Sequence, residues 1–210
     1  MNEYHKIQTV YKRNPATKHK TLLEGDLSLP EFEFLRNNQW LFTEKVDGTN
    51  VRVIFHQGEI IFGGKTDRAQ IPPVLMTRLN ETFLLKIDNF KEIFGDNTIC
   101  LYGEGYGAKV HKGSGRYRPD PGFVLFDIRI DQWWLQRHDV EDIAEKLQID
   151  TVPLIGTGTL QEMVTMAKAG FQSQWGNFTA EGIVARPAVE LKSRNGERII
   201  TKIKHQDFGT

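Results

Sequence analysis

Apolar and polar residues alternate in several stretches of the chain, which predicts β-strands. In "NVRVIFH", residues 50–56, Val51, Val53 and Phe55 fall on one face and the polar residues between them fall on the other. Gln57 and Gly58 then predict a tight turn, after which "EIIFGG" returns as the second strand of a hairpin. The same reasoning predicts strands at "TICLYGEGY", "GFVLFDIRI", "QWWLQ", "AEGIVARP" and "ERIITKIKH".

Apolar residues follow a helical spacing in other parts of the chain. One such segment runs from Val74 to Phe94, and a second helix is predicted over Val140–Leu147. "TLQE", which begins at Thr159, has the spacing of a capping box and predicts the start of another helix. Because strands outnumber helices and several strands form hairpin-style pairs, we expect an α+β fold with antiparallel β-sheets flanked by helices.

The overall composition is that of an ordinary globular protein. The 210 residues contain 27 Lys and Arg and 27 Asp and Glu, so any nucleic-acid contact must come from a local patch. "KVHKGSGRYR", residues 109–118, is the best candidate for such a patch, although a solvated loop explains it equally well. The single cysteine, Cys100, is expected to be buried, and the chain has neither a membrane-length apolar run nor a signal-peptide pattern. We therefore expect a cytoplasmic protein without a membrane partner.

The segment "TEKVDGTN", residues 43–50, contains a candidate nucleophile, Lys45. On this short pattern alone a solvated lysine beside a turn is the better interpretation. Deprotonation of a lysine from its reference pKa of ~10.4 at pH 7 costs about 4–5 kcal/mol. Nearby cations lower that cost, and Lys202 and Lys204 are expected to share one face of a strand. A solvated strand edge is the alternative interpretation of that pair.

Two carboxylates and an aromatic residue are further candidates. Glu104 in "LYGEGYG" and Glu181 in "AEGIVARP" each lie beside glycine and next to an apolar strand. A carboxylate at a strand end is usually solvated, but adjacent glycines allow either a ligand or neighbouring backbone to approach closely. Phe126 in "FVLFDI" fits either core packing or stacking on a base.

Taken in order, these motifs resemble those of the covalent nucleotidyltransferase superfamily, which includes ATP-dependent ligases and mRNA capping enzymes. Within it, "KVDGTN", "GGKTDRAQIP" and "GEGYGAKVHKGSGRY" are most similar to the ATP-dependent RNA ligase family related to phage double-strand nick-sealing RNA ligases. The resemblance spans residues 43–204. It implies an ATP-grasp-like nucleotidyltransferase (adenylation) fold and an enzyme that uses ATP with Mg²⁺ or Mn²⁺.

The resemblance also implies roles for individual residues. Lys45 attacks the α-phosphate of ATP and becomes Lys-AMP, Glu104 contacts the ribose and Phe126 stacks on adenine. Glu104 and Glu181 are the implied metal ligands. The implied nucleotide-binding set is Glu44, Lys45, Val46, Asn50, Arg52, Lys65, Glu104, Phe126, Glu181, Lys202 and Lys204.

In that set, Asn50 and Arg52 face ribose or phosphate, and Lys202 and Lys204 contact the α-phosphate. The implied partner is RNA, whose 5′-phosphate is adenylated and joined to a 3′-OH. The RNA-contact candidates are Lys109, Lys112, Arg116 and Arg118. Whether the natural substrate is a nicked duplex, a broken loop or free strands stays open, as does the oligomeric state.

The chain departs from the family pattern in two ways. After the predicted hairpin it has Lys65 where arginine is expected, with Arg68 three residues later, and we favour Lys65 for that role. The sequence also ends six residues after Lys204, where DNA ligases and capping enzymes carry an OB-fold domain. We therefore expect residues 1–210 to form a single adenylation domain without an OB-fold or other C-terminal domain.

The sequence disfavours three alternatives to an RNA ligase. A DNA ligase or a capping-type nucleotidyltransferase is disfavoured by the missing OB-fold domain. A non-catalytic nucleotide- or RNA-binding module of the same fold is disfavoured because Lys45 and its expected partners are intact. A metalloenzyme is disfavoured because the six histidines have no pair at ligand spacing.

Overall fold

The computed structural model describes residues 3–209, which form two compact units. Unit 1 contains residues 3–4 and 47–152, and unit 2 contains residues 5–46 and 153–209. The chain thus passes between the units after Tyr4, after Val46 and after Val152. Each unit has its own five-stranded sheet. No helix of the described chain is long and apolar enough to cross a membrane.

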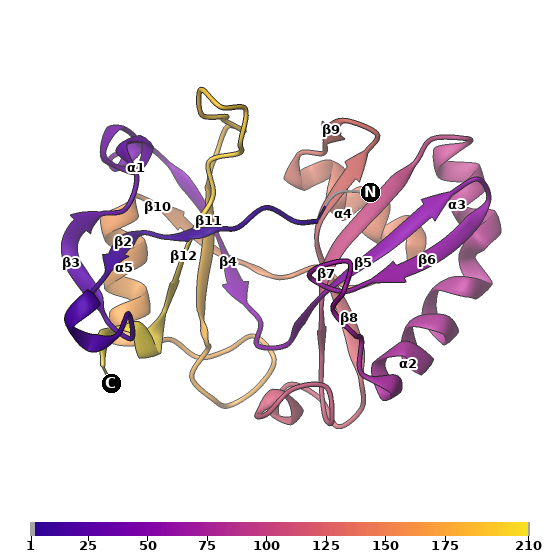
Figure 1. Ribbon diagram of the computed structural model, residues 1–210, viewed down its shortest axis with the longest axis horizontal. Coiled ribbons are helices and arrows are strands. Elements are labelled where there is room, and N and C mark those ends of the chain that lie inside the picture. The colour runs from indigo at the N-terminus through magenta and orange to yellow at the C-terminus, as the bar shows by residue number, and fades with distance from the viewer. Residues whose placement is uncertain (1–2, 210) are drawn as a thin grey trace. The chain divides into compact units, whose positions relative to one another are not determined.

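Unit 1 is built on an antiparallel sheet with the strand order β6-β5-β7-β8-β9. Its strands are β5 (Thr49–His56), β6 (Glu59–Gly63), β7 (Ile99–Tyr106), β8 (Gly122–Ile130) and β9 (Trp133–Trp134) (Figure 1). Its helices are α2 (Pro73–Phe83), η2 (Leu84–Lys86), α3 (Ile87–Phe94), η3 (Ser114–Arg116) and α4 (Arg137–Leu147).

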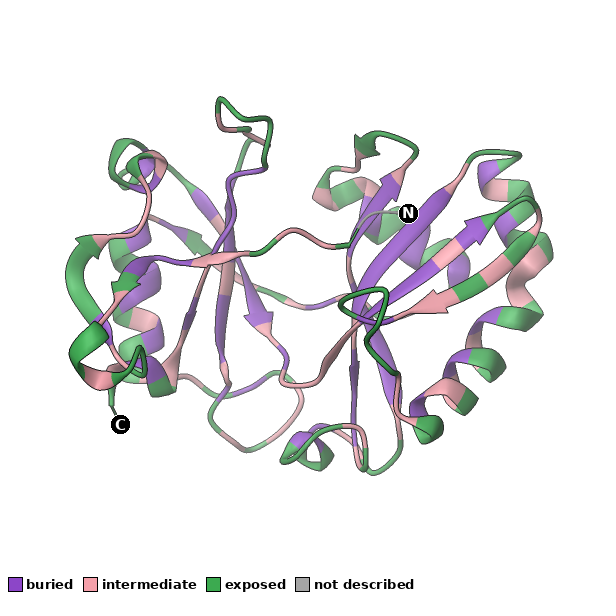
Figure 2. Cartoon of the chain, viewed as in Figure 1, coloured by how far each residue is buried: buried purple, intermediate pink, exposed green. Residues whose placement is uncertain are grey.

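The core of unit 1 lies between the sheet and α2, α3 and α4. Val51, Val53 and Phe55 of β5 are 0–1% exposed and pack in one cluster with residues of all three helices. This confirms the predicted apolar face of the strand. Figure 2 shows buried positions along β7 and β8 and on parts of α2 and α3. The sheet face that carries Asn50, Arg52 and Tyr102 is opposite this core, because alternate residues of a strand point to opposite sides.

Two local features of the unit 1 sheet follow directly from its sequence. Gln57 and Gly58 have φ of 51° and 80°, so they form the two-residue turn that joins β5 to β6. In β8, Asp127 pairs with Tyr102 while Leu125 pairs with Gly103, which leaves Phe126 as an extra residue in a β-bulge. The bulge lets Leu125 and Ile128 both enter the core, although they are three residues apart.

Unit 2 contains a sheet with the strand order β1-β12-β11-β4-β10. The strands are β1 (Gln8–Thr9), β4 (Trp40–Lys45), β10 (Leu154–Gly158), β11 (Gly182–Pro187) and β12 (Thr201–Lys204). Only the β1–β12 pair is parallel; the other pairs in this sheet of the described chain are antiparallel. The remaining elements are η1 (Pro15–Thr17), the β2–β3 pair (Tyr11–Arg13 and Leu22–Leu27), α1 (Pro30–Leu35), α5 (Leu160–Ala169) and η4 (His205–Phe208).

Helix α5 covers the core of unit 2, and its start confirms the predicted capping box. Thr159 Oγ1 accepts a hydrogen bond from Glu162 N at 3.3 Å, and Glu162 Oε2 accepts one from Thr159 N at 2.7 Å. The hydrogen bonds that the Glu162 carboxylate accepts from Thr159 N and Thr159 Oγ1 hold the pKa of Glu162 below its ordinary value. From there Leu160, Met163 and other α5 residues pack against the sheet.

The predicted α+β fold with antiparallel sheets and flanking helices is confirmed. The strand predicted at "ERIITKIKH" is shorter than expected, because the chain before Thr201 closes a turn. In that turn Lys192 and Arg198 form an isolated bridge and Gly196 has φ of 85°. Strands β4 and β10 and the elements before Trp40 have no counterpart among the predicted elements.

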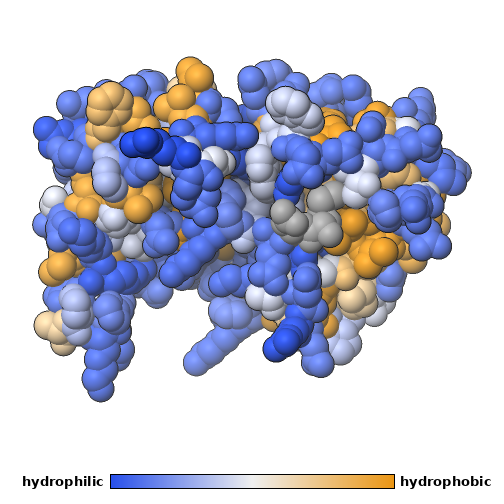
Figure 3. Space-filling model, turned by 45° about the horizontal axis from the view of Figure 1, so that its top comes forward, coloured by the Kyte–Doolittle hydropathy of each residue, from blue (hydrophilic) through white to orange (hydrophobic). Residues whose placement is uncertain are grey.

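The face of the molecule in Figure 3 is mostly hydrophilic, and its hydrophobic side chains form separate groups. Large exposed hydrophobic residues belong to different elements: Phe34 to α1, Leu85 to η2 and Trp133 to β9. Single exposed residues of this kind are common in folded proteins and mark no docking surface.

Candidate active site

Lys45 is the last residue of β4, and the sheet places it on the same face as Lys204. Gly182 of β11 pairs with Lys45 on one side and with Lys204 on the other. Directly opposed residues of antiparallel strands share a face, so the two lysines flank a glycine in one row. Lys202 lies two residues before Lys204 on β12 and therefore on this face as well, as predicted.

The carboxylate of Glu181 lies between the two lysines. Its Oε2 is 2.7 Å from Lys45 Nζ, and its Oε1 is 2.6 Å from Lys204 Nζ. The side chains of Glu181, Lys45 and Lys204 are 8%, 19% and 27% exposed, so the triad is largely screened from water. The expectation of cations around Lys45 was therefore incomplete. An anion bridges the lysines and compensates part of their charge.

Gly182 brings these three side chains together because it has no side chain itself. A Cβ atom at this position would lie 2.1 Å from the carbonyl oxygen of Ile203 and 2.7 Å from Cα of Lys204. Both atoms belong to the backbone of β12, which cannot move aside without disturbing the strand pairing. The glycine beside Glu181 thus permits close approach of neighbouring backbone, one of the two interpretations of this motif.

Glu44 points away from Lys45, into the interior of unit 2. It is 1% exposed, and its carboxylate accepts hydrogen bonds from Ser173 Oγ at 2.6 Å and from Gln174 N at 2.8 Å. The opposite direction follows from the alternation along β4. The structure thus shows Glu44 holding the loop after α5. Val46, also in the predicted nucleotide-binding set, is 3% exposed and accepts a 3.4 Å hydrogen bond from Lys45 Nζ through its carbonyl.

In unit 1, the structure places Asn50 and Glu104 side by side. The two residues pair across β5 and β7. Asn50 Oδ1 is buried and accepts no hydrogen bond from any residue that the structure describes. A buried acceptor without a donor is costly in a folded protein unless another group supplies one. A group that donates a hydrogen bond to Asn50 Oδ1, beside the carboxylate of Glu104, would remove this cost.

Arg52 is more enclosed than the sequence predicts. It is 2% exposed, donates from Nε to the carbonyl of Gly64 at 2.9 Å, and forms an ion pair with Asp67 at 2.7 Å. The ion pair lowers the pKa of Asp67. Arg52 thus fixes the turn after β6, while Lys65 and Arg68 in that turn are both exposed. Exposure alone does not favour either one for the expected arginine role.

Phe126 is half-buried and contacts the N-terminal residue Tyr4. Their ring centroids are 5.1 Å apart at an angle of 75°, an edge-to-face arrangement. The Tyr4 hydroxyl donates to Asp127 Oδ2 at 2.8 Å, and Tyr102 and Trp134 complete the aromatic group. The β-bulge explains why Phe126 is outside the unit 1 core, which a strictly alternating strand does not predict.

The predicted RNA-contact residues occupy a loop with an exposed basic side. Lys109, Lys112 and Arg116 are exposed, and Arg116 lies 5.3 Å from the centre of the Tyr117 ring. Arg118 differs, because it binds the Asp120 carboxylate through two nitrogens at 2.7 and 3.1 Å. This pairing keeps the pKa of Asp120 below its ordinary value. Three of the four predicted residues thus present their charge to solvent.

A comparison with protein-family models matches residues 38–204 to the RNA ligase family. This chain belongs to the RNA ligase family. The matched region begins before β4 and ends at Lys204, so it includes every residue of the predicted nucleotide-binding set. The proposed relation to phage enzymes in particular stays a prediction.

Solved structures of an RNA ligase from Naegleria gruberi resemble this chain in fold. A mutant with AMP and Mn matches at a TM-score of 0.69 and 16% identity, over 99% of this chain and 57% of that one. A mutant with ATP and Mn matches at a TM-score of 0.65 and 18% identity, over 85% of this chain and 54% of that one. A form with PPi matches at a TM-score of 0.69 and 17% identity, over 99% of this chain and 57% of that one. The present chain thus spans about half the length of these chains.

The two carboxylates predicted as metal ligands belong to different units of the chain, Glu104 to unit 1 and Glu181 to unit 2. Within the described residues, no three His, Cys, Asp or Glu side chains are grouped so that they could hold a metal ion by themselves. A divalent ion bound through one carboxylate would need other ligands, and Mg²⁺ typically takes water and substrate phosphates.

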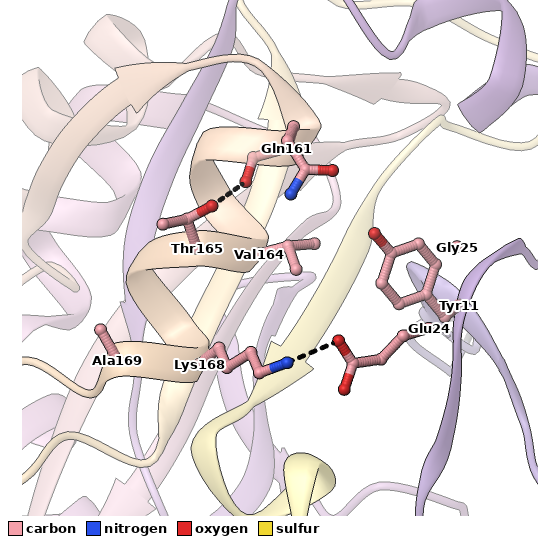
Figure 4. Close-up of a pocket in the computed structure, with 8 residues that line it drawn as sticks. All are labelled: Tyr11, Glu24, Gly25, Gln161, Val164, Thr165, Lys168 and Ala169. Carbon is pink, nitrogen blue, oxygen red and sulfur yellow. Dashed lines mark hydrogen bonds and ion pairs between the residues drawn. The ribbon is translucent and has the colours of Figure 1, made fainter.

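Unit 2 also contains an open cavity of about 590 Å³ beside α5. Figure 4 shows Tyr11 and Glu24 facing Gln161, Val164 and Lys168 across it. Lys168 and Glu24 form a 2.8 Å ion pair. None of the predicted site residues is among the described residues that line this cavity, which separates it from the chemistry of Lys45.

Several residues with specific contacts in these sites were not predicted. Ser173 binds Glu44, Asp127 binds Tyr4, and Ser114 and Tyr117 bind the backbone of Asp47. Each partner is far from the other in sequence, and serine and tyrosine occur in many structural settings. No local pattern indicates such pairs.

Proposed function

We propose that this member of the RNA ligase family is an ATP-dependent RNA ligase in which Lys45 is the nucleophile. Lys45 Nζ attacks the α-phosphate of ATP, forms a P–N bond, and pyrophosphate leaves with the electrons of the broken P–O bond. A 5′-phosphate of RNA then takes the AMP from Lys45. Attack by a 3′-OH on that phosphate forms the phosphodiester and releases AMP.

The observation that carries this proposal is the triad of Lys45, Glu181 and Lys204. Before it attacks, Lys45 must lose the proton that its ion pair with Glu181 stabilises. Lys204 remains 2.6 Å from the other oxygen of Glu181, so the carboxylate keeps a cationic partner when Lys45 becomes neutral. A lone Lys–Glu pair lacks this compensation.

Lys204 and Lys202 also place positive charge on the face that carries Lys45. Phosphoryl-type transfer depends on positioning and on neutralising the charge of the phosphate oxygens, and this pair suits that task. When bound, Mg²⁺ or Mn²⁺ would neutralise phosphate charge, with Glu181 and Glu104 as the residues to hold it. The nucleotides, Mn and PPi in the similar Naegleria structures support the choice of ATP, a divalent ion and pyrophosphate as participants.

Unit 1 offers groups for the nucleoside. Asn50 Oδ1 lacks a donor among the described residues, and a ribose hydroxyl would supply one beside Glu104. Phe126 is outside the core and half-buried, which suits stacking on adenine. Both roles agree with those that the family resemblance implies.

Intact-mass measurement tests the first step. The purified protein is incubated with a divalent ion and ATP, GTP or NAD. We expect a single added AMP from ATP, absent in Lys45→Ala and retained in Lys91→Ala, a matched change at an exposed lysine of α3. A guanylyl adduct would identify a capping-type enzyme. Absence of any adduct would favour a non-catalytic binding module.

Strand joining tests the substrate. RNA strands with 5′-phosphate and 3′-OH ends are supplied as single strands and as a nicked duplex, with matching DNA strands for comparison. We expect the variant with both Lys112→Ala and Arg116→Ala to lose joining tenfold or more and to keep Lys-AMP formation within twofold, because both cations are exposed on a loop. Equal loss of both activities would show that the loop does not act in strand binding, and a preference for DNA strands would indicate a DNA ligase.

A further inference from the structure

The loop that carries the predicted RNA contacts also holds the chain two residues after Lys45. Asp47 N–H donates a 3.1 Å hydrogen bond to the hydroxyl of Tyr117. Asp47 C=O accepts a 2.8 Å hydrogen bond from Ser114 Oγ. Both backbone groups of Asp47 are therefore bound by two side chains of one short loop.

The two side chains are themselves fixed within unit 1. Ser114 is 0% exposed, and its Oγ also accepts a 2.8 Å hydrogen bond from Gly107 N. Tyr117 is 5% exposed, and its ring meets Tyr106 edge to face at 6.1 Å. The loop closes at its base through a 3.1 Å hydrogen bond from Ala108 N to the Arg118 carbonyl. Buried side chains with satisfied hydrogen bonds are rigid, so Ser114 and Tyr117 can hold the backbone of Asp47 in a fixed position.

The residue after Asp47 is held equally tightly. A Cβ on Gly48 would lie 2.2 Å from the carbonyl oxygen of Gly105, so only glycine allows this approach. The chain enters unit 1 at Asp47, and only Val46 separates Asp47 from Lys45. The described contacts of Asp47 and Gly48 thus hold the backbone two and three residues after the nucleophile.

We propose that Ser114 and Tyr117 are positioning residues for Lys45, acting through the backbone of Asp47. This inference rests on the proposed function, because it concerns the rate at which Lys45 attacks ATP. It gives the serine and tyrosine of "GSGRY" a role that is separate from the exposed cations of the same loop. A displacement of a reacting atom by about 1 Å costs up to about 100-fold in rate.

Single-turnover adenylation tests the inference on the full chain. Tyr117→Phe keeps the ring and removes the acceptor for Asp47 N–H. Ser114→Ala removes the donor to Asp47 C=O together with the acceptor for Gly107 N. We expect the maximal rate of Lys45–AMP formation to fall tenfold or more in each variant, with the ATP concentration for half-maximal rate unchanged within twofold. Matched controls are Tyr11→Phe and Ser28→Ala in unit 2, which should adenylate like the wild type.

Joining of a pre-adenylated RNA strand separates positioning from general damage. That reaction bypasses the attack by Lys45, so both variants should seal a synthetic 5′-adenylated strand to a 3′-OH strand within threefold of the wild-type rate. Parallel loss of both reactions, or wild-type adenylation in the variants, would overturn the inference alone. If the wild type forms no adduct with ATP, the proposed function fails and the inference fails with it.

Discussion

Glu181 is the residue on which the charge of the candidate site depends, because it binds Lys45 and Lys204 at once. Its two oxygens serve two lysines from neighbouring strands across Gly182. If either Lys45 or Lys204 is removed, the carboxylate of Glu181 has only the other lysine as its partner. The remaining ion pair is then stronger. The ease with which Lys45 loses its proton therefore depends on Lys204.

Replacement of Lys204 should shift the pH dependence of adenylation. In Lys204→Met the carboxylate of Glu181 has lost one cationic partner, so the charged form of Lys45 is favoured and higher pH is needed to remove its proton. We expect the pH of half-maximal adenylation to rise, measured by single-turnover rates at saturating ATP. An unchanged pH midpoint, even with a lower maximal rate, would show that Lys204 acts only on phosphate.

Burial of Cys100 links stability to high pH. The thiol is 0% exposed, and burial raises its pKa from 9.0 to about 11. Between those values the unfolded chain has lost the proton and the folded chain retains it, so the free energy of unfolding falls as pH rises. Below pH 9 the contribution is complete.

We therefore expect the wild type to lose about 2 kcal/mol more stability than Cys100→Ala between pH 8 and 10.5. Urea unfolding of both proteins at each pH measures the difference. Both proteins retain Tyr102, whose pKa is raised first by burial and further by Cys100, so the comparison removes the part of its effect that is due to burial. A parallel decline of the two proteins would contradict the assigned cause.

At the scale of elements, the pairing of β11 with β4 and β12 decides whether the two lysines contact Glu181. The sequence predicts both strands and the glycine beside Glu181. It does not predict that Gly182 lies between Lys45 and Lys204, because the register joins residues more than a hundred positions apart. Likewise, the bulge at Phe126 depends on the pairing of β8 with β7.

Gly182→Ala should disrupt this arrangement. The added Cβ would lie 2.1 Å from the Ile203 carbonyl oxygen, so the strands must separate, at a cost of about 1–3 kcal/mol. Thermal unfolding and the adenylation rate should both decline. Gly156→Ala in β10 is the matched control, since its nearest neighbour would be Phe42 at 3.7 Å, an ordinary contact. Equal effects of the two changes would argue against the close approach at Gly182.

At the scale of the whole molecule, the described chain has two cores that share no residue. One contains Leu79 with the helices and sheet of unit 1, and the other contains Met163 with α5 and the sheet of unit 2. The residues of the candidate site are divided between the units in the same way. The prediction of one adenylation domain over residues 1–210, without further domains, stays a prediction, as does the cytoplasmic location.

Thiol labelling of Cys100 should show whether unit 1 opens separately. Leu79 and Met163 are both 0% exposed, so Leu79→Ala and Met163→Ala each remove well-packed atoms at a cost of about 2–5 kcal/mol. We expect Leu79→Ala to accelerate labelling at least tenfold and Met163→Ala to change it less than threefold. Equal acceleration by both would mean that the two units unfold together.

The sequence by itself determined the local features of this protein. The alternation of apolar and polar residues predicted β5, and Gln57 with Gly58 predicted the turn that follows it. "TLQE" predicted the start of α5. The ordered motifs indicated the RNA ligase family, which the family comparison then showed. These features depend on neighbouring residues. Only the tertiary structure placed Glu181 between two lysines, turned Glu44 toward Ser173, and joined Asp47 to Ser114 and Tyr117. Such contacts depend on strand register and loop packing between distant segments, which local spacing does not encode.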